Sequence, residues 1–135
     1  MRDNEIGLVP GGELLFHIKF TIVNLSSVLP GTSLVWSIIL PRMKWRYSEN
    51  IRNMEITRKR VNRGVRSYLL RLVGYAITHP DFDEKHPALL KKDGVHLSFI
   101  VNAIFLNQIQ GALESFLKYP YCLVYLFNCD KQMYK

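Results

Sequence analysis

Apolar residues recur at helical spacing in three separate segments of the chain. From Glu13 to Val28 they stand three or four positions apart, which predicts a helix. The same spacing predicts a second helix from about Met54 to Val73 and a third that begins after His96. The expected buried stripes are Leu14, Leu15, Ile18, Ile22, Leu25 and Leu29 in the first helix, Val61, Val65, Tyr68, Leu69 and Leu72 in the second, and Ile100, Ile104, Phe105, Ile109, Leu113, Phe116 and Leu117 in the third.

Two short apolar segments lack this spacing and are predicted to be strands. The segment 32–41, TSLVWSIILP, is rich in β-branched residues and ends at a proline, which is typical of a parallel strand covered on both faces. The segment 74–78, GYAIT, predicts a second strand. The tail after Pro120 is compatible with an edge strand or with an exposed apolar segment. Helices that alternate with buried strands indicate an α/β fold built on a short parallel sheet.

Length and composition indicate one folded domain. The chain has 135 residues, of which 48% are hydrophobic and 21% charged, and this composition excludes an intrinsically disordered chain. No two histidines have metal-ligand spacing, so we expect no metal site and no cofactor. Cys122 and Cys129 are expected to be free thiols in a reducing compartment. Neither a signal peptide nor a transmembrane segment is predicted, so the default location is the cytoplasm or nucleus.

Basic residues gather on the second predicted helix, and the whole chain has a net charge of +7. This helix could contact phosphates of a nucleic acid or another acidic partner, weakly and without a named recognition motif. Trp45 and Tyr47 could then serve as stacking surfaces. The simpler interpretation is a solvated helix face. The residues concerned are Arg58, Lys59, Arg60, Arg63 and Arg66.

An acid and an imidazole stand three residues apart in the loop before the third predicted helix. Asp93 could hold His96 in one tautomer, as the acid of a nucleophile–base–acid triad does. The alternative is an aspartate that caps the helix beside a polar histidine. No Gly-x-Ser-x-Gly turn supplies a nucleophile. Ser37, near the carboxyl end of a predicted strand, is a candidate substitute, although a core serine bonded to the backbone is the simpler interpretation.

Three stretches of the chain resemble the C-terminal half of the SGNH (GDSL-type) hydrolases, in particular the SGNH-like domains of animal retroelement-related uncharacterised proteins. They are RDNEIGLVPGGEL at 2–14, LVWSIILPR at 34–42 and DGVHLSFIVNAIFLNQIQGALESF at 93–116, of which DGVHL is the most specific. The resemblance implies a partial three-layer α/β/α fold, flavodoxin-like, over residues 1–117. It leaves 118–135 as a divergent apolar tail that could self-associate.

The same resemblance implies roles for three residues. Asp93 and His96 match the acid and base of the family's triad, and Asn4 matches an oxyanion-hole asparagine, although its run here reads Arg2-Asp3-Asn4-Glu5. An asparagine in a plain turn is the alternative for Asn4. The family's serine turn and first strands precede this block and are not in this sequence. The resemblance therefore predicts an incomplete ester hydrolase domain, truncated or diverged, that is inactive alone.

Overall fold

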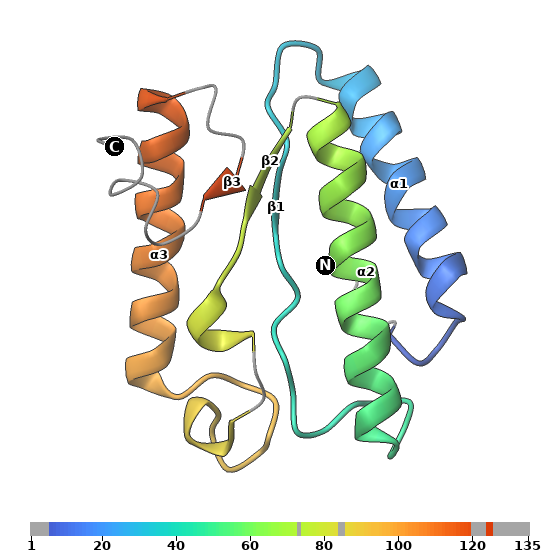
Figure 1. The fold of residues 1–135 in the computed structure, drawn as a ribbon, viewed down its shortest axis with the longest axis vertical. Coiled ribbons are helices and arrows are strands. Elements are labelled where there is room, and N and C mark those ends of the chain that lie inside the picture. The colour runs from blue at the N-terminus through green and yellow to red at the C-terminus, as the bar shows by residue number, and fades with distance from the viewer. Residues whose placement is uncertain (1–5, 73, 84–85, 120–123, 126–135) are drawn as a thin grey trace, which may run out of the picture.

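The computed structural model describes residues 6–72, 74–83, 86–119 and 124–125, and it shows a mixed α/β fold (Figure 1). Its elements are helices α1 (Gly11–Val28), α2 (Ile51–Arg71) and α3 (Phe99–Lys118), strands β1 (Val35–Ser37), β2 (Tyr75–Ile77) and β3 (Val124–Tyr125), and the 3-10 turns η2 (Pro80–Phe82) and η3 (Pro87–Leu89). All three predicted helices are present, and β1 and β2 lie inside the two predicted strand segments. The predicted mixture of helices and strands is therefore confirmed.

The described strands form a parallel sheet in the order β1-β2-β3. Val35 of β1 pairs with Tyr75 of β2, and Ser37 pairs with Ile77. The two-residue strand β3 joins the far side of β2, also in parallel orientation. Of the two arrangements that the sequence left open for the tail, an edge strand is found at Val124–Tyr125, and the remainder of the tail lies outside the described residues.

Strand β1 is shorter than the apolar run that predicted it, because helix α2 takes over its hydrogen bonds. The Ile38 N–H still donates to the carbonyl of Ile77, at 3.2 Å. At Ile39 the partner changes to Asn62 of α2, whose Oδ1 accepts from the Ile39 N–H and whose Nδ2 donates to the Ile39 carbonyl, both at 2.9 Å. Arg58 Nη1 donates to the same carbonyl at 2.8 Å. Side chains of a helix thus satisfy this backbone in place of a strand.

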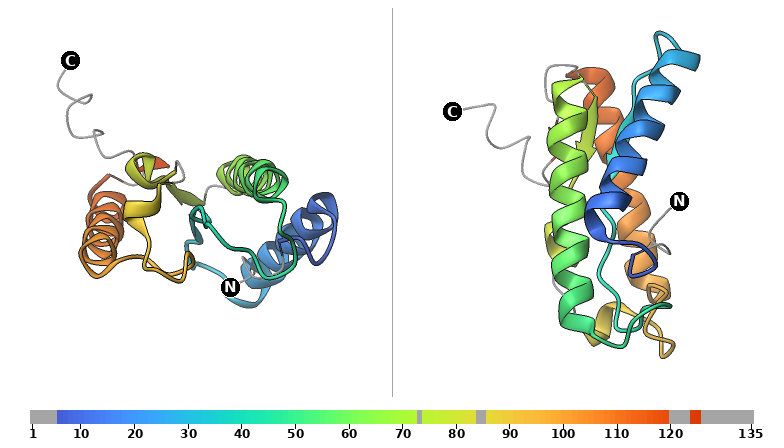
Figure 2. Two further views of the ribbon diagram at one scale, coloured as in Figure 1. Left: turned by 90° about the horizontal axis from the view of Figure 1, so that it is seen from below. Right: turned by 90° about the vertical axis from the view of Figure 1, so that its right-hand side faces the viewer.

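Helices lie on both sides of the sheet (Figure 2). The main core joins α1, α2 and β1, with Ile18, Trp36 and Val65 among its buried residues. A smaller cluster on the other side joins Ile77 of β2 to Ala112 and Phe116 of α3. The close approach of α1 and α2 explains the glycine at position 64 in the middle of a helix. A Cβ atom there would lie 2.6 Å from a methyl carbon of Leu15.

The predicted buried stripe of α3 is wrong in most of its positions. Phe116 is buried, but Ile100 is 72% exposed and Leu117 is 86% exposed. The buried positions of α3 are instead Gln108, Ala112 and Phe116. Within the described residues the helix packs on β2 and the short β3, so only a narrow strip of it is covered. The position of the sheet, and not the most apolar face, decides which residues are buried.

The other two stripes are confirmed in their central positions. Leu14, Ile18 and Ile22 of α1 are buried, whereas Leu25 and Leu29 are exposed. In α2 the buried positions include Val61, Val65 and Leu69, and Leu72 is exposed. No helix among the described residues is long and apolar enough to span a membrane.

Candidate functional site

The loop that carries Asp93 and His96 is a short hairpin closed by backbone hydrogen bonds. Leu90 and Leu97 form an antiparallel bridge at its base. Inside the bridge, the Lys91 N–H donates to the carbonyl of His96 at 2.7 Å. The sequence prediction of a turn followed by a helix places the loop correctly, but the antiparallel bridge joins residues that the local pattern does not link.

Gly94 fastens this loop to the connection between β1 and α2. Its carbonyl accepts hydrogen bonds from the N–H groups of Met43, at 2.9 Å, and Lys44, at 3.1 Å. Its φ of 72° lies in the left-handed region, which favours glycine. A Cβ atom at this position would also lie 3.1 Å from Cβ of Met43. The backbone conformation therefore favours glycine, and the close contact leaves little room for a side chain.

Asp93 and His96 are in direct contact. The Nδ1 atom of His96 lies 2.7 Å from Asp93 Oδ2, and Asp93 Oδ1 accepts from the N–H groups of Val95, at 2.9 Å, and His96, at 3.0 Å. The hydrogen bond from the His96 ring, followed by those from the two N–H groups, holds the pKa of Asp93 well below its usual range. At neutral pH Asp93 is a carboxylate, so in the neutral form of His96 the ring proton lies on Nδ1 and Nε2 is an acceptor.

The helix-capping alternative for Asp93 is not what the structure shows. Helix α3 is capped by Ser98, whose Oγ accepts from the Val101 N–H at 3.4 Å. Asp93 instead orders its own loop and orients His96. The His96 side chain remains 72% exposed, so its ring is open to solvent and to a ligand.

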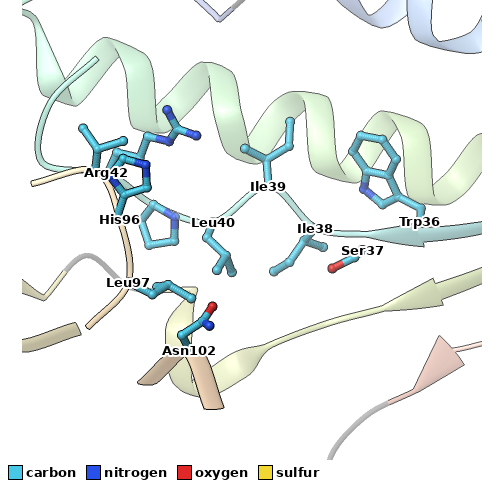
Figure 3. Close-up of a pocket in the computed structure, with 11 residues that line it drawn as sticks. Trp36, Ser37, Ile38, Ile39, Leu40, Arg42, His96, Leu97 and Asn102 are labelled. Carbon is cyan, nitrogen blue, oxygen red and sulfur yellow. The ribbon is translucent and has the colours of Figure 1, made fainter. Parts of the chain in front are cut away.

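A cavity of about 400 Å³ lies between the end of β1 and this loop (Figure 3). His96 and Ser37 are at opposite ends of it, with apolar side chains such as Leu40 between them. The lining residues are Trp36, Ser37, Ile38, Ile39, Leu40, Pro41, Arg42, Val95, His96, Leu97 and Asn102. The carboxyl end of a parallel strand therefore lines the cavity, and ligands of α/β proteins commonly bind at such strand ends.

Among the described residues, Ser37 is hydrogen-bonded to a histidine and not to the backbone, which corrects the core-serine interpretation. Its Oγ lies 3.1 Å from Nε2 of His79, and Nδ1 of His79 lies 2.7 Å from Oε1 of Gln108. His79 is fully buried, against the ring of Phe105 at a centroid distance of 4.6 Å. Burial lowers the pKa of His79, although the hydrogen bond to Gln108 acts in the opposite direction.

Neither His79 nor Gln108 was predicted from the sequence as a site residue. A signal for His79 was present, because it stands two and four residues after Ile77 and Tyr75 and so continues one face of β2. The proline that follows it indicated a loop and concealed this alternation. For Gln108 no local signal exists, since a glutamine on a helix is ordinarily exposed.

The arginine cluster of α2 divides into a buried and a surface part. Arg58 is fully buried, and its guanidinium contacts the carboxylates of Glu55 and Asp83, each at 2.9 Å. Burial alone would lower the pKa of Arg58, but the hydrogen bonds to these carboxylates outweigh it and raise the pKa. Arg58 therefore fixes α2 to the strand ends and is not on the surface.

The surface part borders a second hollow, of about 320 Å³. Lys59, Arg63 and Arg66 contribute to its lining, and Arg60 is exposed on the same helix. Of the two aromatic residues expected to stack on bases, Tyr47 is exposed but Trp45 is buried, with the guanidinium of Arg42 over its ring at 5.7 Å. Trp45 is therefore not available as a stacking surface.

Several predicted residues lie outside the described part of the chain. These are Asn4, Cys122 and Cys129. Among the described residues, no group of three or more histidine, cysteine, aspartate or glutamate side chains could hold a metal ion. Comparison with known proteins yields no match to any protein-family model, curated protein or solved structure.

Proposed function

We propose that this chain is an SGNH-type hydrolase-like domain that supplies the acid–base half of an ester hydrolase site. The observation that carries the proposal is the 2.7 Å contact between Asp93 and His96 at the rim of a cavity. Two further features support it. The cavity adjoins the carboxyl end of a parallel strand, and helices cover the sheet from both sides, as a three-layer α/β/α domain requires.

In this proposal His96 is the general base and Asp93 its orienting acid. The carboxylate keeps the proton on Nδ1, so Nε2 can take the proton of a hydroxyl nucleophile, and it stabilises the imidazolium that results. Ser37 lies at the other end of the cavity, bonded to His79. Hydrolysis through His96 therefore needs a serine brought by another segment. Without such a serine, His96 can act only as a general base, and that form of catalysis contributes about 10²- to 10⁴-fold to a reaction rate.

The test is hydrolysis of a chromogenic acetate ester by the 135-residue chain and by His96→Ala. We expect no saturable turnover that depends on His96, so the parent chain and His96→Ala should release product at the same rate. A segment bearing the first strand and Gly-Asp-Ser turn of an SGNH hydrolase, fused or added in trans, should restore turnover to the parent chain but not to His96→Ala. His17→Ala, which changes a half-buried histidine of α1, serves as the matched control.

Two outcomes would overturn the proposal. Saturable turnover by the chain alone that His96→Ala abolishes would show that His96 already has a nucleophile. Restored turnover that is the same with and without His96 would show that the Asp93–His96 pair is not the base.

A second candidate function is favoured by the basic hollow beside α2. We propose, as the alternative, that Lys59, Arg63 and Arg66 bind phosphates of a nucleic acid or another polyanion, with Arg60 beside them. Such binding releases counterions, so affinity for an arbitrary oligonucleotide should fall steeply between low and physiological salt.

Fluorescence anisotropy with a labelled oligonucleotide tests this alternative. The triple variant Arg60→Gln, Arg63→Gln, Arg66→Gln should lose most of the binding. A triple variant at Arg46, Arg52 and Arg71 removes the same charge elsewhere and should lose much less. Equal losses in the two variants, or binding that salt does not weaken, would contradict a site in the hollow.

A further inference from the structure

Ser37, His79 and Gln108 come from three elements and form one hydrogen-bonded chain. Ser37 is the last residue of β1, His79 stands two residues beyond β2, and Gln108 is on α3. Because β1 and β2 are parallel and paired, their carboxyl ends lie side by side and bring the hydroxyl to the imidazole. The two links measure 3.1 Å from Oγ to Nε2 and 2.7 Å from Nδ1 to Oε1.

Gln108 determines the direction of the hydrogen bonds. Its carbonyl oxygen faces Nδ1, so the ring proton is on Nδ1 and the lone pair of Nε2 faces the Ser37 hydroxyl. Burial, which lowers the pKa of His79, keeps this imidazole neutral at neutral pH. A neutral imidazole with its Nε2 lone pair on a serine hydroxyl is the form in which histidine acts as a general base.

A glutamine at position 108 would also be a destabilising choice if its role were purely structural. Its side chain is buried, at 4% exposure, and its Nε2 has no hydrogen-bond partner among the described residues. An unpaired buried donor destabilises the fold, whereas leucine or methionine would fill similar space without that penalty. A polar residue kept here is consistent with a role for its oxygen on His79.

Of the three hydrogen-bonded residues, Ser37 is the one that lines the cavity. The cavity lining includes seven consecutive residues, 36–42, together with residues 95–97 and Asn102 of α3, and the Ser37 side chain lies at one end of it. In a β-ladder successive N–H groups point to opposite edges. Since the Ile38 N–H points to β2, the Ser37 N–H points away from β2, to the same edge of β1 as the Ile39 N–H. Ile38, Leu40 and Leu97 make the space beyond Ser37 apolar.

We propose that Ser37, His79 and Gln108 are a nucleophile, general base and positioning residue that transfer an acyl group from a small apolar ester to Ser37. Oγ forms a bond to the ester carbonyl carbon while its proton passes to His79 Nε2, and the electron pair of the C=O bond moves to its oxygen. The bond from the carbonyl carbon to the leaving oxygen then breaks. That oxygen takes the proton from His79 and departs as an alcohol, leaving acylated Ser37. This proposal does not rest on Asp93 or His96.

A fluorophosphonate probe tests the proposal, because its phosphorus is attacked by the same Oγ, fluoride leaves and the adduct is stable. Intact-mass measurement and peptide mapping follow the rate of labelling. We expect one adduct, on Ser37, formed about a hundredfold or more faster than on the exposed Ser33. Ser37→Ala should abolish it, and His79→Gln should reduce it about a hundredfold. His17→Gln is the matched histidine control and should leave the rate unchanged.

Gln108 has a test of its own. Gln108→Glu keeps an oxygen acceptor for Nδ1 and should retain labelling, whereas Gln108→Leu removes it and should lose labelling while far-UV circular dichroism shows the helices intact. If Gln108 were merely structural, labelling would not depend on whether the side chain at position 108 keeps an oxygen. Labelling of Ser37 no faster than that of Ser33, or equal rates in His79→Gln and His17→Gln, would overturn the proposal.

Discussion

The side-chain amide of Asn62 pairs with the backbone of Ile39 as a neighbouring strand would. Its Oδ1 and Nδ2 lie 2.9 Å from the Ile39 nitrogen and oxygen respectively. The pair lies just beyond the end of β1, where the chain lines the cavity, and it fastens this segment to α2.

Asn62→Ala should destabilise the fold by about 1–3 kcal/mol, because the N–H of Ile39 loses its acceptor while it stays largely shielded from water. Urea denaturation at 25 °C measures the change in the free energy of unfolding. Asn53→Ala, on the exposed face of the same helix, should cost less than about 0.5 kcal/mol. Equal changes in the two variants would show that the Asn62 amide contributes no more than a surface residue.

Arg58→Met should cost about 3 kcal/mol, the lower end of the range for breaking a buried ion pair, because Asp83 keeps some contact with water. The variant leaves the Glu55 carboxylate without its partner and removes one donor from the Ile39 carbonyl. Arg60→Met, at an exposed position, is the control and should change stability little. A small effect of Arg58→Met would mean that packing of the methionine side chain stabilises the fold as much as the ion pairs of Arg58 do.

Gly94→Ala should destabilise more than Gly31→Ala. Both glycines have positive φ, 72° and 79°, so each substitution carries the penalty for the left-handed conformation, about 1–2 kcal/mol. Only at Gly94 does the new Cβ meet a neighbour, Cβ of Met43 at 3.1 Å; at Gly31 nothing lies within 4 Å. Crowding should add about 1 kcal/mol at Gly94. Equal losses in thermal or urea unfolding would show that the loop moves away from Met43 without penalty.

The fold should lose stability as the pH falls below about 6.5, the ordinary pKa of a histidine in an unfolded chain. Burial lowers the pKa of His79 in the folded state, so in this window the unfolded chain binds a proton that the folded chain does not. Stability therefore rises with pH there, by at most about 1.4 kcal/mol per pH unit for one proton. The loss should level off below the folded pKa of His79.

The difference between the parent chain and His79→Gln isolates this effect, since the other ionisable groups are common to both. Urea denaturation between neutral and mildly acidic pH should show a smaller pH slope in the variant. Identical slopes would mean that His79 binds its proton equally in the folded and unfolded states.

Local sequence pattern predicted the three helices from the spacing of their apolar residues, and the strand segments around β1 and β2 from their short apolar runs. Helix and strand spacing is a local property, and a repeat of 3.6 or 2 residues is readable without knowledge of neighbours. The Asp93–His96 pair was predictable for the same reason, since its partners are three residues apart in one loop.

Only the tertiary structure decided which polar residues are buried and which of them meet. Ser37, His79 and Gln108 are joined through contacts across 42 and 29 residues of sequence, which depend on the pairing of β1 with β2 and on the place where α3 packs. Arg58 has the charge of a surface residue, but the Asp83 carboxylate and the Ile39 carbonyl that stabilise it inside come from outside α2. The exposed stripe of α3 has the same cause, because burial requires a packing partner and local hydrophobicity does not specify where that partner lies.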